Sequence, residues 1–142
     1  MQTLEELRAQ GFSVEPSGER ALVLLPDSAS SFVLLHAGEW VQVATCVLEE
    51  TELDDDTARP ALNEFLLRVH ARYLGCRFAY DEDGSLVMAT DIYPENLAAD
   101  HLANVVIQMD FVVSALLPLI RSTQSSKKVP SESELDRAFE RS

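Results

Sequence analysis

The chain has 142 residues, a length that fits one domain with a sizeable core, and its 46% hydrophobic and 25% charged content is ordinary for a globular protein. Its charge is unusual, because 11 basic against 24 acidic residues give a formal net charge of −13. Such a body is repelled by nucleic acid and by anionic membrane surfaces, so neither is predicted as a partner. The acidity serves general solubility or, more specifically, keeps an apolar partner-binding surface in solution.

The N-terminal stretch MQTLEELRAQGF lacks the basic-then-apolar pattern of a secretion signal and is typical of a helix start. No run approaches the roughly 18 uncharged apolar residues that span a bilayer, so no membrane insertion is predicted. Cys46 and Cys76 are too few and too far apart for a disulfide framework or a zinc knuckle. Both lie in apolar, strand-like runs, which predicts small buried thiols in a cytoplasmic protein.

The first half predicts a short helix followed by four strands. Leu4 and Leu7 give the helix an apolar side before Gly11 ends it. Apolar or alternating runs then cover residues 12–16, 21–25, 31–37 and 40–48. Antiparallel succession is the simplest arrangement for four strands connected by such short segments.

An acidic run and a second helix follow. Six acids in eight residues, Glu49, Glu50, Glu52, Asp54, Asp55 and Asp56, precede the stretch DTARPALNEFLLRVHARYLG. Apolar side chains in that stretch have the spacing of a buried helix face: Leu62, Phe65, Leu66, Val69, Tyr73 and Leu74. The acids are therefore predicted to be solvated loop and helix cap, where carboxylates favour the positive end of the helix dipole. Catalysis by paired carboxylates would need a pocket that separates their pKa values.

The stretch FAYDEDGSLVMATD is the segment that most resembles a cation site. An EF-hand loop with Gly84 at its sixth position would require oxygen ligands at Ala79 and Thr90, which cannot supply the expected carboxylates. A hairpin with Asp83-Gly84 as a two-residue turn is favoured instead. That turn would pair Tyr80 with Val87.

The same register pairs Phe78 with Ala89 and places Leu86 and Met88 on the opposite face. These two side chains are then either covered by a helix or open to a partner.

A long helix is predicted from about Leu97 to Arg121. Its main apolar stripe consists of Leu102, Val105, Val106, Met109, Val112, Val113, Leu116, Leu117 and Ile120. Ile107 and Phe111 fall on the opposite, polar side of the helix. A helix that covers one sheet needs no second apolar line, so a terminal helix covers these residues or they form a subunit or partner interface.

The domain is expected to span residues 1–122, followed by a mobile C-terminal tail over 123–142. Ser131 and Glu134 have the spacing of a capping box, which allows a short helix in the tail. Leu135 and Phe139, four residues apart, either cover the second apolar line or dock elsewhere.

Specific catalytic or cofactor signatures are missing from the sequence. His36, His70 and His101 lie in separate elements without metal-binding spacing, and there is no Gly-rich phosphate loop, nucleophile elbow or cysteine–histidine signature. No enzyme activity, cofactor or metal site is therefore predicted. The alternative is an enzyme or metal protein whose site is assembled by folding from dispersed histidines and acids.

Together these elements predict an α+β fold, a single antiparallel sheet packed by helices in the order α-β-β-β-β-α-β-β-α. That order resembles the class I type III secretion chaperone fold, which YbjN-like proteins share. The stretch LNEFLLRVHARYLGCRFAYDEDGSLVMATDIYPENL is similar to a helix, then GxRFAxDEDGxLV, then an apolar-acid-apolar strand end. This layout resembles the bacterial YjfI family, found near genes for PspA-like membrane-stress proteins.

The resemblance covers Leu62 to Arg121, and the first half only by element order. It implies protein binding without catalysis, formation of a dimer and a link to envelope stress, and it supplies no catalytic residue. The chain is thus expected to be a cytoplasmic adaptor or chaperone-like homodimer that binds another protein. The candidate interface residues are Leu86, Met88, Ile107, Phe111, Leu135 and Phe139.

Overall fold

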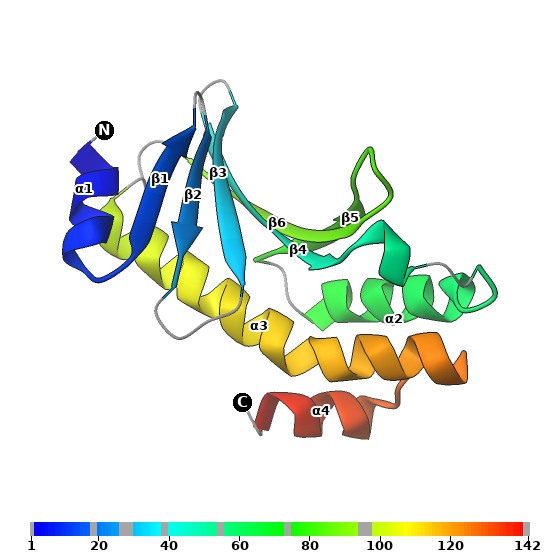
Figure 1. The fold of residues 1–142 in the computed structure, drawn as a ribbon. Helices are drawn as coiled ribbons and strands as arrows, with labels where there is room; N and C mark the ends of the chain where they lie inside the picture. Colours follow the sequence, from blue (N-terminus) through cyan, green and yellow to red (C-terminus); the bar gives the residue numbers. More distant parts are fainter. Residues whose placement is uncertain are drawn as a thin grey trace.

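A computed structural model describes residues 2–17, 20–25, 30–37, 40–53, 56–72, 75–93 and 98–140. The elements are, in order, α1 (Gln2–Ala9), β1 (Ser13–Ser17), β2 (Arg20–Leu24), β3 (Ser31–Ala37), β4 (Trp40–Leu48), the 3-10 turn η1 (Glu50–Glu52), α2 (Arg59–Arg72), β5 (Arg77–Tyr80), β6 (Leu86–Ile92), α3 (Ala99–Ser126) and α4 (Glu132–Glu140). Figure 1 shows their arrangement. The predicted α+β class and element order are confirmed, with η1 and α4 in addition.

The strands form one antiparallel sheet in the order β1-β2-β3-β4-β6-β5. The first four strands follow one another as predicted. The hairpin β5–β6 then joins through β6, which pairs with β4 and leaves β5 at the edge (Figure 1). The helix between β4 and β5 therefore has to cross from the middle of the sheet to its edge.

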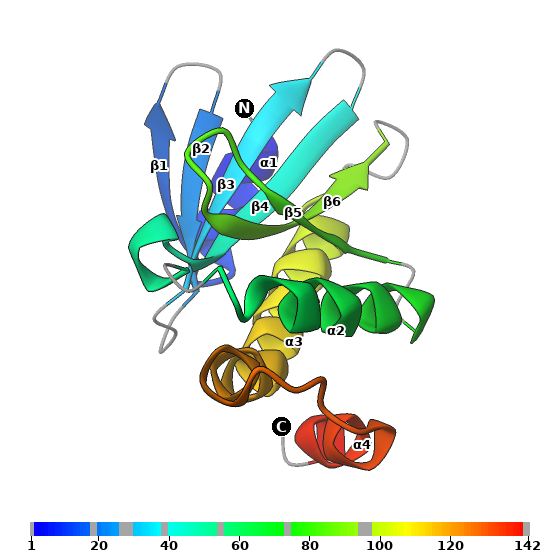
Figure 2. The same cartoon turned by 90° about the vertical axis from the view of Figure 1, so that its right-hand side faces the viewer.

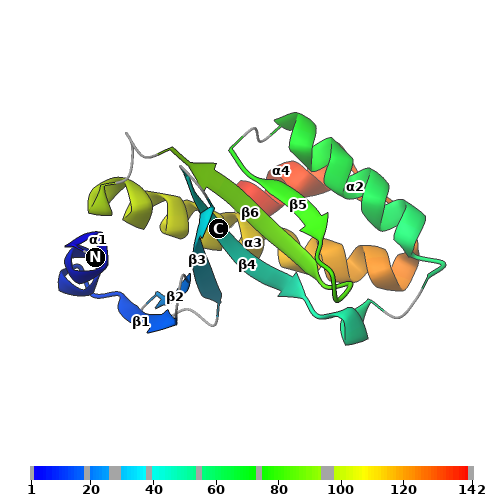
Figure 3. The ribbon, with the colours of Figure 1, turned by 90° about the horizontal axis from the view of Figure 1, so that it is seen from above.

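The helices lie on one side of the sheet, with α3 running beneath its whole width (Figures 1 and 3). All members of the predicted stripe of α3 are buried except Val105 and Leu117, which are partly buried against the core. On α2, the predicted residues from Leu62 to Val69 are buried. Tyr73, Leu74, Asp54, Asp55, Leu97 and the side chain of His36 lie outside what the structure describes.

Helix α3 is longer than predicted, because it continues through Pro118 to Ser126, beyond the expected domain boundary at residue 122. It is also apolar enough to cross a membrane by length and composition, with an 18-residue window of mean hydropathy 1.8. The expectation concerned runs of uncharged apolar residues and is not contradicted, because Asn104, Gln108 and Asp110 interrupt α3 while a window average tolerates isolated polar residues. The buried side of α3 packs against α1, α2 and β4, and a core position is a sufficient reason for its hydrophobicity.

The predicted register of the β5–β6 hairpin is wrong by one residue. Tyr80 pairs with Leu86 rather than with Val87, and Phe78 pairs with Met88. A shift of one residue moves every side chain of one strand to the other face of the sheet. Leu86 and Met88 consequently share the core face with Phe78, and both are fully buried.

The turn explains the shift, because it has three residues instead of two. The backbone N–H of Asp81 donates to the carbonyl of Ser85 at 3.0 Å, and Gly84 N–H donates to the carbonyl of Asp81 at 3.0 Å. The Asp81 carboxylate also accepts hydrogen bonds from the backbone N–H groups of Asp83 and Ser85. With Gly84 at a φ of 87°, this is the three-residue hairpin loop that ends on a left-handed residue.

Gly84→Ala is expected to lower the free energy of unfolding by about 1–2 kcal/mol, because an L side chain resists a positive φ. Space is not the cause, since an added Cβ would meet only the Glu50 side chain, at 3.7 Å. Urea unfolding measures the loss. The matched control is Gly75→Ala, where no atom lies within 4 Å and φ is not positive, so stability should be unchanged or slightly higher. Equal losses in both variants would contradict the turn assignment.

Candidate protein-binding surfaces

Leu86 and Met88 are not available as surface contacts. Both have 0% exposed surface and belong to the core beneath α2 and α3. Of the two alternatives that the sequence left open for them, burial under a helix is the one observed. The expectation that they contact a partner in the folded chain is therefore corrected.

Ile107 and Phe111 lie on the outer side of α3, one turn apart, as predicted. Ile107 is 50% exposed and Phe111 is 39% exposed, so neither is withdrawn into the core. The ring of Phe111 packs against Phe139 of α4, with centroids 6.0 Å apart and planes tilted by 37°. We call Ile107, Phe111 and Phe139 the helix patch.

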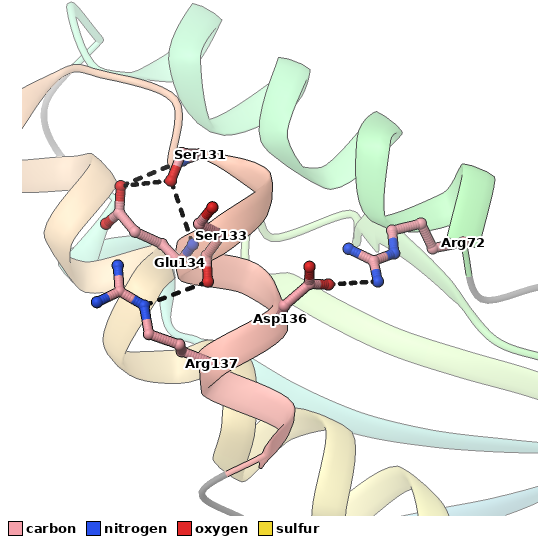
Figure 4. A network of polar contacts seen from close by, with 6 residues as sticks. All are labelled: Arg72, Ser131, Ser133, Glu134, Asp136 and Arg137. Atoms are coloured by element: carbon pink, nitrogen blue, oxygen red, sulfur yellow. Dashed lines mark hydrogen bonds and ion pairs between the residues drawn. The ribbon is translucent and has the colours of Figure 1, made fainter.

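Helix α4 docks beside α3 rather than trailing away from it (Figure 2). Leu135 is 4% exposed and part of the core, while Phe139 is partly buried against it. The predicted capping box is present: Glu134 N–H donates to Ser131 Oγ, and Ser131 N–H donates to Glu134 Oε1, both at 3.2 Å (Figure 4). The C-terminal helix thus covers part of the second apolar line of α3 and leaves Ile107 uncovered.

Two polar features border this helix. Arg72 of α2 forms an ion pair with Asp136 at 2.6 Å, and both side chains remain substantially exposed (Figure 4). A cleft of about 360 Å³ lies between α3 and α4, lined by Ser114, Ala115, Pro118, Leu119, Glu134, Arg137 and Ala138. Because an exposed ion pair contributes little, apolar contacts, among them those of the buried Leu135 and the Phe111–Phe139 pair, provide most of the attachment of α4.

A second apolar surface lies on the side of the sheet that faces away from the helices. Leu22 pairs with Val33, Val33 pairs with Ala44, and Ala44 pairs with Ala89, so these side chains share one face. Their sequence neighbours Ala21 and Leu34 are buried on the core face. None of the described elements covers the outer face; in Figure 3, β4, β5 and β6 cross in front of α3 with no helix before them. Its apolar members, hereafter the sheet face, are Leu22, Leu24, Val33, Leu35, Ala44 and Val87.

Sequence reasoning missed the sheet face. The runs ALVLL and SFVLLHA carry apolar residues at successive positions, whereas a strand covered on one side alternates apolar with polar residues. The continuous apolar runs were therefore the signal in the sequence that both faces of these strands are apolar.

Both edges of the sheet are occupied by side chains from neighbouring helices. At β1, the Arg8 guanidinium donates to the carbonyl of Val14 at 2.9 Å, and Pro16 has no N–H to offer. At β5, the backbone N–H of Phe78 donates to His70 Nε2 at 2.7 Å. Exposed edges invite strand addition, so these contacts reduce the number of free edge groups at β1 and β5.

The described cysteines and histidines lie apart from the helix patch. Cys76 and His101 line a cavity of about 500 Å³ between the end of α2, β6 and α3. Burial raises the pKa of Cys76, which keeps it a thiol and a poor nucleophile. His70 acts structurally as the acceptor for Phe78. Among the described residues, no three His, Cys, Asp or Glu side chains are grouped so that they could hold a metal ion.

The expectation of two buried thiols is wrong for Cys46, which is exposed, while Cys76 is half-buried. Cys46 lies on the outer face of β4, opposite Val87. Its pKa is raised to about 11 by partial burial and by nearby Glu49, with weaker effects of Asp81 and Glu52. The outer face of the sheet therefore ends in a region of negative potential.

No protein-family model and no curated protein matches this sequence. Solved structures do share its fold. A chain of the HopA1–SchA chaperone–effector complex aligns with a TM-score of 0.55 and 14% identity over 88% of this chain and 92% of the other. A chain of the ExsC–ExsE complex gives 0.53 and 21% over 92% and 94%. YbjN from E. coli gives 0.58 and 11% over 92% and 95%.

These identities are low, so the likeness establishes a common fold across nearly the whole chain. The resemblance to a chaperone-like and YbjN-like architecture is thereby confirmed.

Proposed function

We propose that this protein is a non-enzymatic, cytoplasmic binding module that acts as an adaptor or chaperone-like protein for another protein. The observation that carries the proposal is the exposed helix patch, with Ile107 at 50% and Phe111 at 39% exposure on a helix whose other side fills the core. Apolar patches of this kind mark interaction sites more often than they mark bare solvent-facing surface. The fold shared with a chain of a chaperone–effector complex supports the same role.

The finer parts of this role are also proposals. Self-association through the helix patch would make the protein a homodimer, because a patch that includes two phenylalanines gains from meeting its own copy across a two-fold axis. The hairpin sequence GCRFAYDEDGSLV supports membership of the YjfI-like family and, through it, a link to envelope stress. Blocked sheet edges and the net charge of −13 limit nonspecific association.

Ile107→Asp and Phe111→Asp are each expected to convert a dimer into a monomer, because each places a carboxylate in the apolar contact. Sedimentation equilibrium measures the mass. Two positions are used because Phe111 also contacts Phe139, whereas Ile107→Asp leaves that contact intact. Circular dichroism verifies that both variants remain folded.

The matched control is Ser122→Asp, which adds the same charge at an exposed position of α3, about 16 Å beyond Phe111 along the helix axis. Its mass should equal that of the wild type. A wild type that is monomeric at micromolar concentration would refute self-association. A native partner that is retained equally by wild type and both patch variants would refute the helix patch as the binding surface.

A further inference from the structure

The sheet face extends across β2, β3, β4 and β6 without a covering element among the described residues. Its central row runs Leu22, Val33, Ala44, Ala89 by direct pairing, and Leu24 and Val87 lie in the next row toward β4's end. Four strands about 4.8 Å apart make such a face about 14 Å wide, the length of a helix of about 10 residues.

One end of this face is strongly acidic. The turn of the β5–β6 hairpin and η1 meet there: Glu50 N–H donates to Ser85 Oγ at 3.1 Å, and Ser85 Oγ lies 3.5 Å from Glu49 Oε2. Asp81 and Glu52 belong to the same two segments. We call Glu49, Glu50, Glu52 and Asp81 the acidic end. Arg121 pairs with Glu52 at 3.2 Å and offsets one of these charges.

The field of the acidic end reaches the sheet face itself. Cys46 stands on the outer face beside Val87, and the charges of Glu49, Asp81 and Glu52 help to raise its pKa. A cation placed over Cys46 would therefore be attracted by several carboxylates at once. The position of Cys46 on the outer face and the raised pKa of its thiol both place the negative potential beside Val87.

The opposite end of the face has different charges. Arg20 is exposed beside Leu35, with which it pairs. Arg77 and Asp91 form an ion pair at 3.0 Å and cancel one another. The apolar face is thus bounded by a net negative end and, at the other end, by Arg20, while Glu15 and Arg77 flank its central row at β1 and β5.

We propose that the sheet face binds an amphipathic segment of a partner protein, with apolar side chains along its length and lysine or arginine at the end that lies over the acidic end. Charge complementarity selects this occupant, because a basic terminus finds several carboxylates at one edge and Arg20 repels it at the other. The segment lies on the sheet face, from the acidic end toward Arg20, rather than adding to β1 or β5, where Arg8 and His70 each occupy one backbone edge group. This inference rests on the proposed protein-binding role and identifies the chemical class of the partner.

A second copy of this chain fits the face less well. Each copy would bring its own acidic end and a net charge of −13, against a single Arg20. Like charges at an interface cost affinity, so a basic segment is favoured over self-association here. Self-association through the sheet face remains an outcome that the experiment can detect.

The test uses fluorescence anisotropy of a labelled peptide of about 14 residues, of which about 10 match the width of the apolar face. One side of the peptide carries leucines and one end carries four lysines; a second peptide has the lysines replaced by glutamates. The wild-type chain should bind the lysine peptide, and the glutamate peptide should bind at least about tenfold more weakly at low salt. The difference should disappear near 1 M salt, where the screening length is about 3 Å.

Two variants locate the site on the full chain. Val33→Asp, at the centre of the face, should lose binding of the lysine peptide. Glu49→Gln with Glu50→Gln, which removes charge from exposed side chains while keeping their size, should weaken it about tenfold at low salt. The matched control is Glu132→Gln with Glu140→Gln on α4, which removes the same charge from the helix side of the molecule and should change nothing.

Several results would overturn the inference. Equal binding of the two peptides, no binding of the lysine peptide, or an unchanged affinity in Glu49→Gln with Glu50→Gln would each refute it. A fall in sedimentation mass on Val33→Asp would assign the face to a second copy. If the lysine peptide does not bind while Ile107→Asp still lowers the sedimentation mass, the sheet-face inference is refuted and the proposed function stands. If the lysine peptide binds while the helix patch variants have the mass and partner binding of the wild type, the role of the helix patch is refuted instead.

Discussion

Met88→Asp is expected to abolish cooperative folding, while Val87→Asp, one residue away, should leave the domain folded. Met88 has no exposed surface and lies between the sheet and its helices, so its carboxylate would be buried without a partner. Breaking a core in this way costs several kcal/mol, comparable with the 5–15 kcal/mol that stabilises a typical domain. Urea unfolding followed by circular dichroism measures both variants.

Val87 is the appropriate comparison because it belongs to the same strand and faces the other way, opposite Cys46 and Ala79. Its substitution places charge on the uncovered sheet face, where water solvates it. The outcome decides the register of the hairpin. Were Val87→Asp the unfolding variant and Met88→Asp the tolerated one, the two-residue turn that pairs Tyr80 with Val87 would be the correct arrangement.

Leu135→Ala is expected to release α4 from α3. Truncation of a buried leucine costs about 2–5 kcal/mol, and Leu135 is the buried side chain of this nine-residue helix. Hydrogen exchange should show loss of amide protection in residues 132–140, with protection in β3 and β4 retained. Phe111 would then lose its contact with Phe139 and become more exposed, which enlarges the uncovered part of the helix patch.

The control for α4 is Arg72→Ala, which removes the ion pair with Asp136. The side chain of Arg72 is 39% exposed and that of Asp136 is 52% exposed. Exposed ion pairs contribute about 0–1 kcal/mol, so the amides of α4 should stay protected from exchange. Protection of α4 that survives Leu135→Ala and disappears in Arg72→Ala would show that the charges, rather than the buried leucine, hold the helix.

Local patterns in the sequence account for most of the elements. The spans 31–37 and 40–48 coincide with β3 and β4, because strand-forming residues bounded by short turns define them locally. The stripe of α3 and the buried residues of α2 follow from helical spacing alone. The Ser131–Glu134 capping box likewise depends on side chains only three residues apart, so it forms as the sequence predicts.

Part of the candidate site was also predictable. Ile107 and Phe111 are exposed on α3 because the helix has only one side facing the core, and a wheel locates the other side without knowledge of the fold. The fate of Leu86 and Met88 was not predictable in this way. It depended on one residue in a turn, where the Asp81 carboxylate and a left-handed Gly84 select three residues over two.

The sequence by itself determined the α+β class, the order of helices and strands and the apolar helix faces, since these follow from interactions between residues that are close along the chain. Only the tertiary structure decided which face of the sheet stays uncovered. It also placed η1 and the hairpin turn beside Cys46, and docked α4 against Phe111. The reason is physical: a period of two shows that a strand has two faces, but not which face the helices will cover, and that choice depends on contacts between residues far apart in the chain.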